Sequence, residues 1–124
     1  MEAVEVMTAR NIGSIMVMEE GALLGLFTER DLMKRVVAEK KDTASVLVSD
    51  VMTTELVTIK TTDSIMDAMT LMNKHHIRHV PIMNPDGSPD SLLTMRNIQS
   101  FRLEQLRQEN ETLSALALHD GPGG

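Results

Sequence analysis

The sequence predicts an α+β fold, an α/β sandwich in which two copies of one unit pack as a pseudo-two-fold pair. Three observations predict it. Residues 1–19 and 66–84 align at an offset of 65, with five identical positions. Both copies combine apolar residues at helical spacing with short β-branched or aliphatic runs. With 124 residues the chain has the length of one small domain, and self-similarity at this period is typical of a repeat architecture.

The second copy shows the unit most completely, with the order β-α-β-β-α. Residues 56–59 form a short β-branched run, and residues 61–63 offer N-cap side chains for a helix. Apolar spacing predicts that this helix runs from Ser64 to about His76. Strands are expected at 80–83 and 91–94, joined by the turn formers of 84–90, and a helix is expected to start after Thr94.

The first copy lacks the opening strand of the unit. Residues 15–18 and 23–27 are expected to form a hairpin with its turn at 19–22, followed by a closing helix at 29–41. The sequence begins inside the first helix, so nothing corresponds to the opening strand. Either the sequence is cut there, or another chain or the tail covers the sheet edge, which would otherwise be open to association.

These patterns divide the chain into four parts. We expect a first repeat at 1–41, incomplete at its N-terminus, a linker at 42–54 with a helical turn at 48–53, and a second repeat at 55–108. Residues 109–124 are expected to be a helical extension with a disordered tail from 119. A coiled-coil-like seam crosses the last boundary, formed by Leu103, Leu106, Asn110, Leu113 and Ala117. The seam fits a helix that packs on its own domain or a partner, and it also fits a true coiled coil.

Composition excludes several classes of protein. A formal net charge of −6 argues against general nucleic-acid binding, which requires a basic field. The chain has no cysteine and therefore no disulfide or thiolate metal site. We find no apolar run of about 18 residues, so no membrane span is expected. We expect a soluble protein of the cytoplasm or an organelle matrix, and the sequence does not decide between these compartments.

Metal binding and catalysis find little support in the sequence. His75 and His79 are four residues apart, as on one helix face, but the strand pattern that begins near Ile77 breaks the helix between them. No serine is tied to a histidine and an aspartate by a known motif, and phosphate-binding and dinucleotide-binding glycine motifs are absent. We therefore predict no metal site and no enzyme activity.

Thr28 and Asp31 form a Thr-x-x-Asp pattern where a predicted strand meets a helix, and Thr94 and Asn97 repeat it at an offset of 66. One interpretation is purely structural, since this spacing is close to a capping box. The other is a ligand site: the start of a helix favours a phosphate, and the carboxylate can accept hydrogen bonds from ribose hydroxyls. Asn97 carries no charge and is the weaker candidate.

The chain resembles the tandem cystathionine-β-synthase-type domains, known as the CBS pair or Bateman module. The resemblance rests on residues 11–32, 48–59 and 75–83, which recur in the order and at the distances of that family. It covers the chain from Met1 to about Leu106, and the extended tail is similar to that of stand-alone CBS-pair proteins. Two departures stand out: Asn97 replaces the usual aspartate, and the opening strand of the first repeat is missing.

The resemblance implies a regulatory sensor that binds an adenosine-containing ligand (AMP, ADP, ATP, NAD or S-adenosylmethionine) and controls a partner protein. It implies that Asp31 holds the ribose, that the other repeat contributes a loop, and that the protein pairs through helices as a homodimer. No catalytic cofactor is expected. The predicted binding residues are Gly13, Ser14, Ile15, Thr28, Arg30, Asp31, Thr58, Lys60, Thr61, Arg78, His79, Thr94 and Asn97. The alternative is a dimerisation or interaction module that binds no ligand.

Overall fold

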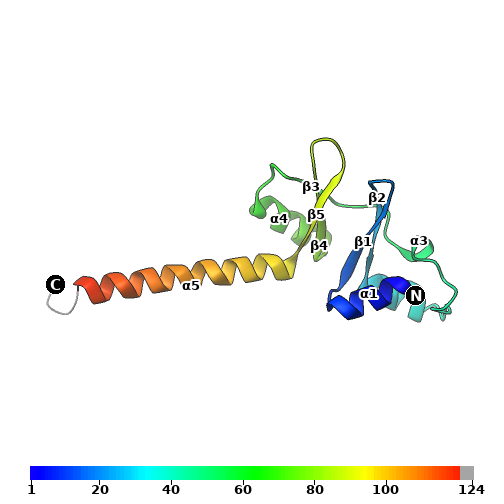
Figure 1. The fold of residues 1–124 in the computed structure, drawn as a ribbon, viewed down its shortest axis with the longest axis horizontal. Helices are drawn as coiled ribbons and strands as arrows, with labels where there is room; N and C mark the ends of the chain where they lie inside the picture. The colour runs from blue at the N-terminus through cyan, green and yellow to red at the C-terminus, as the bar shows by residue number, and fades with distance from the viewer. Residues whose placement is uncertain (121–124) are drawn as a thin grey trace.

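The computed structural model describes the chain from residue 1 to residue 120, and the surroundings of side chains from residue 1 to residue 112. Figure 1 shows an α+β architecture, as predicted, in which the first repeat starts with a helix. The elements in chain order are α1 (Glu2–Arg10), β1 (Ser14–Glu19), β2 (Ala22–Thr28), α2 (Glu29–Asp31), the π-helix η1 (Leu32–Val37), α3 (Val48–Val51), β3 (Ile59–Lys60), α4 (Ile65–His75), β4 (His79–Met83), β5 (Pro89–Thr94) and α5 (Met95–Asp120).

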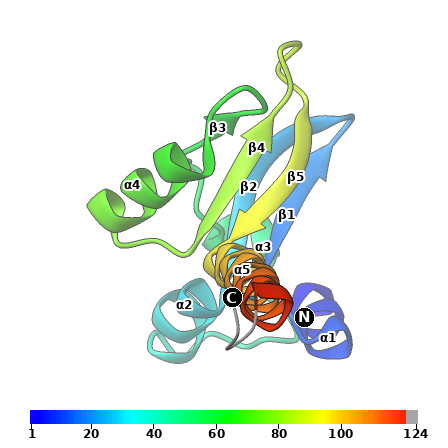
Figure 2. The ribbon, with the colours of Figure 1, turned by 90° about the vertical axis from the view of Figure 1, so that its left-hand side faces the viewer.

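Each repeat contributes its own small sheet: the two sheets stand side by side in Figure 1, and in Figure 2 the sheet of the second repeat lies in front of the hairpin of the first. In the first repeat β1 and β2 form an antiparallel hairpin. In the second repeat β4 pairs with β5 in antiparallel fashion and with β3 in parallel. The expected strand at 56–59 is wrong in its bounds, because pairing with β4 begins only where Ile59 meets Ile82. The preceding linker instead pairs Thr53 with Leu26 of the first repeat, so the chain crosses between the sheets before β3 starts.

The duplication is visible in the backbone. Helices α1 and α4 both end at a residue in the left-handed conformation, Asn11 with φ of 52° and His76 with φ of 53°. In each repeat the next residue donates its backbone N–H back to the helix at 3.0 Å. Each repeat also has a separate apolar core: the first comprises Ala3, Met7, Phe27, Val36 and Val51, and the second comprises Ile59, Ala68, Met72, Val80 and Ile98.

Two helix boundaries differ from the prediction. Helix α4 is capped by Ser64, whose hydroxyl accepts from the backbone N–H of Asp67, and not by residues 61–63. The closing helix of the first repeat ends at Val37 instead of residue 41, because Lys40 takes the left-handed conformation with φ of 56°. The predicted helical turn of the linker is confirmed as α3.

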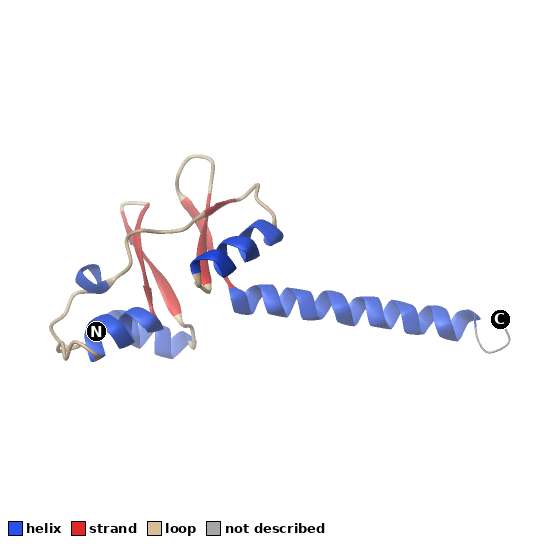
Figure 3. Ribbon diagram, turned by 180° about the vertical axis from the view of Figure 1, so that it is seen from behind, coloured by secondary structure: helices blue, strands red, loops and turns tan. Residues whose placement is uncertain are grey.

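Helix α5 extends away from the two repeats (Figure 3). The seam leucines Leu103 and Leu106 are 69% and 51% exposed, so the idea that this face packs on its own domain is wrong for these two residues. The side chains of Leu113 and Ala117 lie outside the described residues. Residues 119 and 120 of the expected disordered tail are helical, and residues 121–124 are not described. Between residues 1 and 120, no helix is long and apolar enough to cross a membrane.

Candidate functional site

A pocket of about 260 Å³ lies where the two repeats meet. Its walls come from the end of β2 and start of α2, from the linker, and from the turn between α4 and β4. The lining residues are Gly13, Thr28, Glu29, Arg30, Asp31, Thr53, His76, Ile77, Arg78 and His79. The structure thus brings together six of the predicted site residues: Gly13, Thr28, Arg30, Asp31, Arg78 and His79.

The duplicated backbone positions these residues. In the first repeat the N–H of Glu29 donates to the carbonyl of Gly13 at 3.0 Å, and in the second the N–H of Met95 donates to that of Arg78 at 2.9 Å. Each bond ties the entry of a hairpin to the start of the helix that follows it. Across the repeats, Nη1 of Arg30 donates to the carbonyl of His76 at 3.4 Å.

Thr28 and Asp31 form a complete capping box, as the structural interpretation of their pattern predicts. The backbone N–H of Thr28 donates to Oδ2 of Asp31 at 3.0 Å, and the Thr28 hydroxyl donates to the same oxygen at 3.2 Å. In return, the N–H of Asp31 donates to Thr28 Oγ1 at 3.2 Å. These contacts fix the Asp31 side chain against the turn that enters α2.

The second oxygen of Asp31 is also engaged. Its Oδ1 accepts from the hydroxyl of Thr53 at 2.9 Å, and Nε of Arg35 lies 3.7 Å away. Asp31 is consequently only 5% exposed. Both carboxylate oxygens of Asp31 therefore accept hydrogen bonds from protein groups in this structure. The reason is that the linker pairs with β2 and carries Thr53 onto the carboxylate.

Asn97, the third residue of α5, forms the same reciprocal hydrogen bonds with Thr94 but has a different environment. Its Oδ1 accepts from the N–H of Thr94 at 3.3 Å and from the Thr94 hydroxyl at 2.8 Å. Asn97 is exposed and does not line the pocket. Within residues 1–112, no side chain other than that of Thr94 donates a hydrogen bond to Asn97, whereas Asp31 also accepts one from Thr53.

The remaining predicted site residues lie away from the pocket lining. Ser14 is 4% exposed within β1, and Ile15 packs against the first core. Thr58, Lys60 and Thr61 lie in or beside β3, at the outer edge of the order β3-β4-β5. These three residues of the second repeat are not part of the lining of the pocket that contains Asp31.

Four lining residues were not predicted from the sequence: Glu29, Thr53, His76 and Ile77. Glu29 was visible inside the Thr-x-x-Asp pattern, and its carboxylate lies over Gly13, since a Cβ built on Gly13 would be 2.9 Å from Glu29 Oε1. No local sequence signal marks Thr53, whose position follows from the pairing of the linker with β2.

The pocket has mixed charge, with Arg30 and Arg78 beside the carboxylates of Glu29 and Asp31. Partial burial lowers the pKa of His79 below its usual 6.5, the Glu29 carboxylate opposes this decrease, and Arg78 adds to it. Among the described residues, no group of three or more histidine, aspartate or glutamate side chains is arranged to hold a metal. The arrangement suits a small ligand that carries both anionic and hydroxyl groups.

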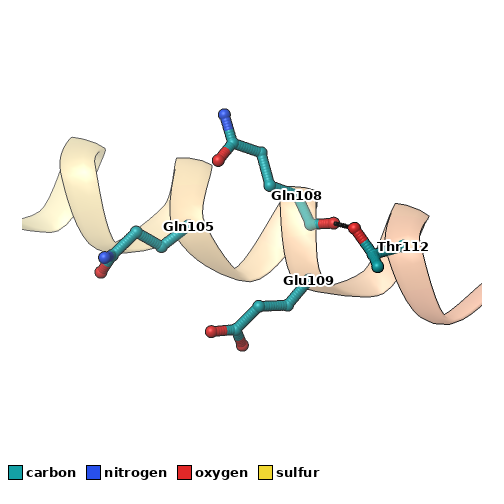
Figure 4. Close-up of a pocket in the computed structure, with 4 residues that line it drawn as sticks. All are labelled: Gln105, Gln108, Glu109 and Thr112. Atoms are coloured by element: carbon teal, nitrogen blue, oxygen red, sulfur yellow. Dashed lines mark hydrogen bonds between the residues drawn. The ribbon is translucent and has the colours of Figure 1, made fainter.

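A larger hollow of about 530 Å³ lies along α5 (Figure 4). It is lined by Gln105, Gln108, Glu109 and Thr112, and its one drawn hydrogen bond runs from the Thr112 hydroxyl to the carbonyl of Gln108 at 2.9 Å. All four side chains belong to one exposed helix. This hollow is an open surface without a second wall, so the pocket between the repeats is the better candidate site.

Comparison with known proteins places the chain among CBS proteins. A family model described as "CBS domain" matches residues 1–38 and 48–104. The mitochondrial CBS domain-containing protein CBSX3 of Arabidopsis thaliana is 30% identical over 92% of this chain, and the CBS domain-containing protein YhcV of Bacillus subtilis is 42% identical over 69%. The matched stretches span 57% and 61% of those two relatives. A solved structure of a protein with CBS domains from Burkholderia ambifaria superposes with a TM-score of 0.77 at 26% identity, covering 84% of this chain and 76% of the other.

Proposed function

We propose, since this chain belongs to the CBS domain family, that it is a regulatory module that binds an adenosine-containing nucleotide between its repeats. One observation carries the proposal. The pocket joins the Thr28–Asp31 turn of the first repeat to Arg78 and His79 of the second. A single small molecule in this pocket would contact both repeats.

The ligand class is supported by structures that share the fold. The CBS domain pair of protein MJ0100 was solved with 5′-methylthioadenosine and S-adenosylmethionine, at a TM-score of 0.71 and 24% identity to this chain. A CBS domain protein of Pyrobaculum aerophilum was solved with AMP, at a TM-score of 0.70 and 23% identity. These ligands belong to those proteins, and our proposal extends their chemical class to this chain.

Each charged group has a role in the proposed complex. The guanidinium groups of Arg30 and Arg78 would attract the anionic end of the ligand, since charge-assisted hydrogen bonds to phosphate are the stronger kind. The Asp31 carboxylate would accept from a ribose hydroxyl. Glu29 lies over Gly13, one of the predicted binding residues, and its carboxylate can accept from the exocyclic amine of the base.

Occupancy would be transmitted through the relative positions of the repeats. The two apolar cores are separate, and among the described residues a hydrogen bond from Arg30 to the carbonyl of His76 links the repeats across the pocket. A ligand that contacts both repeats shifts the balance between arrangements only by its differential affinity for them. The regulated partner is a protein that senses this difference, and the role of the chain is regulatory and not catalytic. Its compartment, cytoplasm or organelle matrix, stays a prediction.

A second candidate function is a homodimeric assembly module without a ligand. The observation that favours it is the engagement of both Asp31 oxygens by protein groups. Large apolar side chains on the helices and linker are exposed and available for pairing, namely Met33, Val37, Leu47, Met66, Leu103 and Leu106. Homodimerisation through helices is compatible with either function.

Thermal unfolding with AMP, ADP, ATP, NAD and S-adenosylmethionine distinguishes the two functions. At about 100 times Kd, binding to the folded state adds about 2.7 kcal/mol to the free energy of unfolding. This corresponds to an increase in Tm on the order of 10 °C for a domain of this size. An increase with at least one of these compounds supports the sensor, and an unchanged Tm with all five favours the assembly module.

A further inference from the structure

The Asp31 carboxylate accepts one hydrogen bond from a donor outside its own capping box. The bonds from the N–H and hydroxyl of Thr28 are local and belong to the capping box. The bond from the Thr53 hydroxyl to Oδ1, 2.9 Å long, comes from the linker 22 residues further along the chain. Thr53 and Asp31 both line the pocket, so the hydrogen bond between them belongs to the pocket wall.

The backbone of Thr53 is firmly placed. Its N–H donates to the carbonyl of Leu26 at 2.8 Å, and its carbonyl accepts from the N–H of Leu26 at 2.9 Å. Arg35 strengthens the same segment, since its Nη1 donates to the carbonyl of Met52 at 2.9 Å while its Nε lies 3.7 Å from Asp31. The Thr53 side chain can therefore leave Oδ1 by rotation about its χ1 bond while the backbone stays in place.

The second repeat provides an internal comparison. Asn97 and Thr94 are linked by the same three hydrogen bonds that link Asp31 and Thr28. In the described part of the chain no linker hydroxyl reaches it, and Asn97 is exposed. The Thr53 contact is thus an addition to the capping geometry that is found in only one of the two repeats.

We propose that the Thr53 hydroxyl is a built-in competitor that occupies Oδ1 of Asp31 and must be displaced by a hydroxyl of the ligand's sugar. The inference rests on the proposed function and adds a residue that sets the affinity of the same site. Oδ1 accepts its one hydrogen bond from the Thr53 hydroxyl, and the Arg35 guanidinium faces the same oxygen at 3.7 Å, beyond hydrogen-bond distance. A sugar hydroxyl that takes the place of Thr53 gains a charge-assisted bond to Oδ1 but costs the protein its bond from Thr53, so the net gain in affinity is reduced.

The test is isothermal titration calorimetry of Thr53→Val, Thr53→Ser and wild type with AMP and with S-adenosylmethionine. Valine removes the hydroxyl and keeps the side-chain shape, so we expect Thr53→Val to bind about tenfold more tightly. Thr53→Ser keeps the hydroxyl and should bind as the wild type does. Exposed Thr54 provides the matched control, and Thr54→Val should leave the Kd unchanged.

A ligand without sugar hydroxyls completes the design. The gain in affinity of Thr53→Val should disappear with 2′,3′-dideoxyadenosine 5′-monophosphate, because that ligand has no hydroxyl to place on Oδ1. If Thr53→Val is folded, as its Tm would show, but binds AMP no more tightly than wild type does, the proposal that Thr53 competes with the ligand is wrong. The proposed nucleotide-binding function would not be affected by that result. If neither wild type nor variant bound any of the five adenosine-containing compounds, the proposed function would fail, and the proposal for Thr53 would fail with it.

Discussion

Asp31 and Asn97 hold equivalent places in the two repeats, and each accepts hydrogen bonds from the threonine three residues before it. Their surroundings differ, because Asp31 is 5% exposed whereas Asn97 is exposed. The difference originates in the linker, which pairs with β2 and covers Asp31 with Thr53. One duplicated capping motif has therefore become two sites with different properties.

The two capping residues should differ in their contribution to stability. Asn97→Ala removes the exposed side chain that accepts from the N-cap residue Thr94 and should lower the free energy of unfolding by about 1 kcal/mol. Asp31→Ala removes the equivalent acceptor for Thr28 and also leaves the Thr53 hydroxyl without its acceptor, so we expect a loss of about 2–3 kcal/mol. Urea unfolding of both variants without ligand measures the difference. If both variants lost the same free energy of unfolding, the contacts of Asp31 with Thr53 and Arg35 would not contribute to the stability of the fold.

Gly25 should be required for the attachment of the linker to β2. A Cβ on Gly25 would be 2.7 Å from the backbone carbonyl oxygen of Thr53 and 2.8 Å from Met52 Sδ. Because a backbone atom moves less easily than the end of a flexible side chain, Gly25→Ala should lower the free energy of unfolding by about 1–3 kcal/mol. Gly13→Ala is the control, since there the close atom is Oε1 of the flexible Glu29 side chain. The Tm of Gly25→Ala should be well below the Tm of Gly13→Ala. The opposite order would contradict the close packing of Gly25 against Thr53 and Met52.

His79 should make the protein less stable in mild acid. Burial lowers its pKa in the folded state below 6.5, so the unfolded chain binds the proton more readily. Stability should therefore fall as the pH decreases through about 6.5, and should continue to fall until the folded-state pKa is passed. Urea unfolding between pH 7.5 and about pH 5 should show a smaller loss in His79→Gln than in wild type. The exposed His75→Gln serves as the control, and a pH dependence in His79→Gln equal to that of wild type would contradict the assignment.

Glu29 provides an independent check on His79. Its carboxylate raises the pKa of His79 against the stronger effect of burial. Glu29→Gln should therefore lower that pKa further, which an NMR titration of the imidazole resonances can follow. An unchanged pKa would place the Glu29 carboxylate too far from His79 to act on it.

The exposed seam of α5 gives a test of homodimerisation. Light scattering on the wild type should give twice the chain mass of 13.7 kDa. Leu103→Glu with Leu106→Glu puts four charges into a paired seam and should give a monomer, with little change in monomer stability because both leucines are exposed. Gln105→Glu with Gln108→Glu adds the same charge elsewhere on the helix and should remain a dimer. A wild type of 13.7 kDa would reject the homodimer, and a dimeric leucine variant would assign pairing to another helix.

The sequence predicted the fold well because its main signals are local and duplicated. Met7 and Met72 sit at matched places in the two cores, as the alignment of the repeats requires. The predicted strand at 56–59 and the predicted helix cap at 61–63 were wrong in their bounds. Strand pairing and the cap at Ser64 depend on contacts that hydrophobic spacing does not reveal. The capping geometry of Thr28 and Asp31 was predictable from a three-residue spacing. The hydrogen bond from Thr53 was not, since it depends on how the linker folds back on β2.

The central claim is that Asp31 binds an adenosine nucleotide between the repeats, and calorimetric titration of the variants tests it most directly. The titrant is the compound among the five nucleotides that raises Tm the most. We predict that wild type and Asn97→Ala bind it with similar Kd, and that Asp31→Ala, folded at the measurement temperature, gives no binding heat. Binding by Asp31→Ala as tight as that of wild type would contradict the claim.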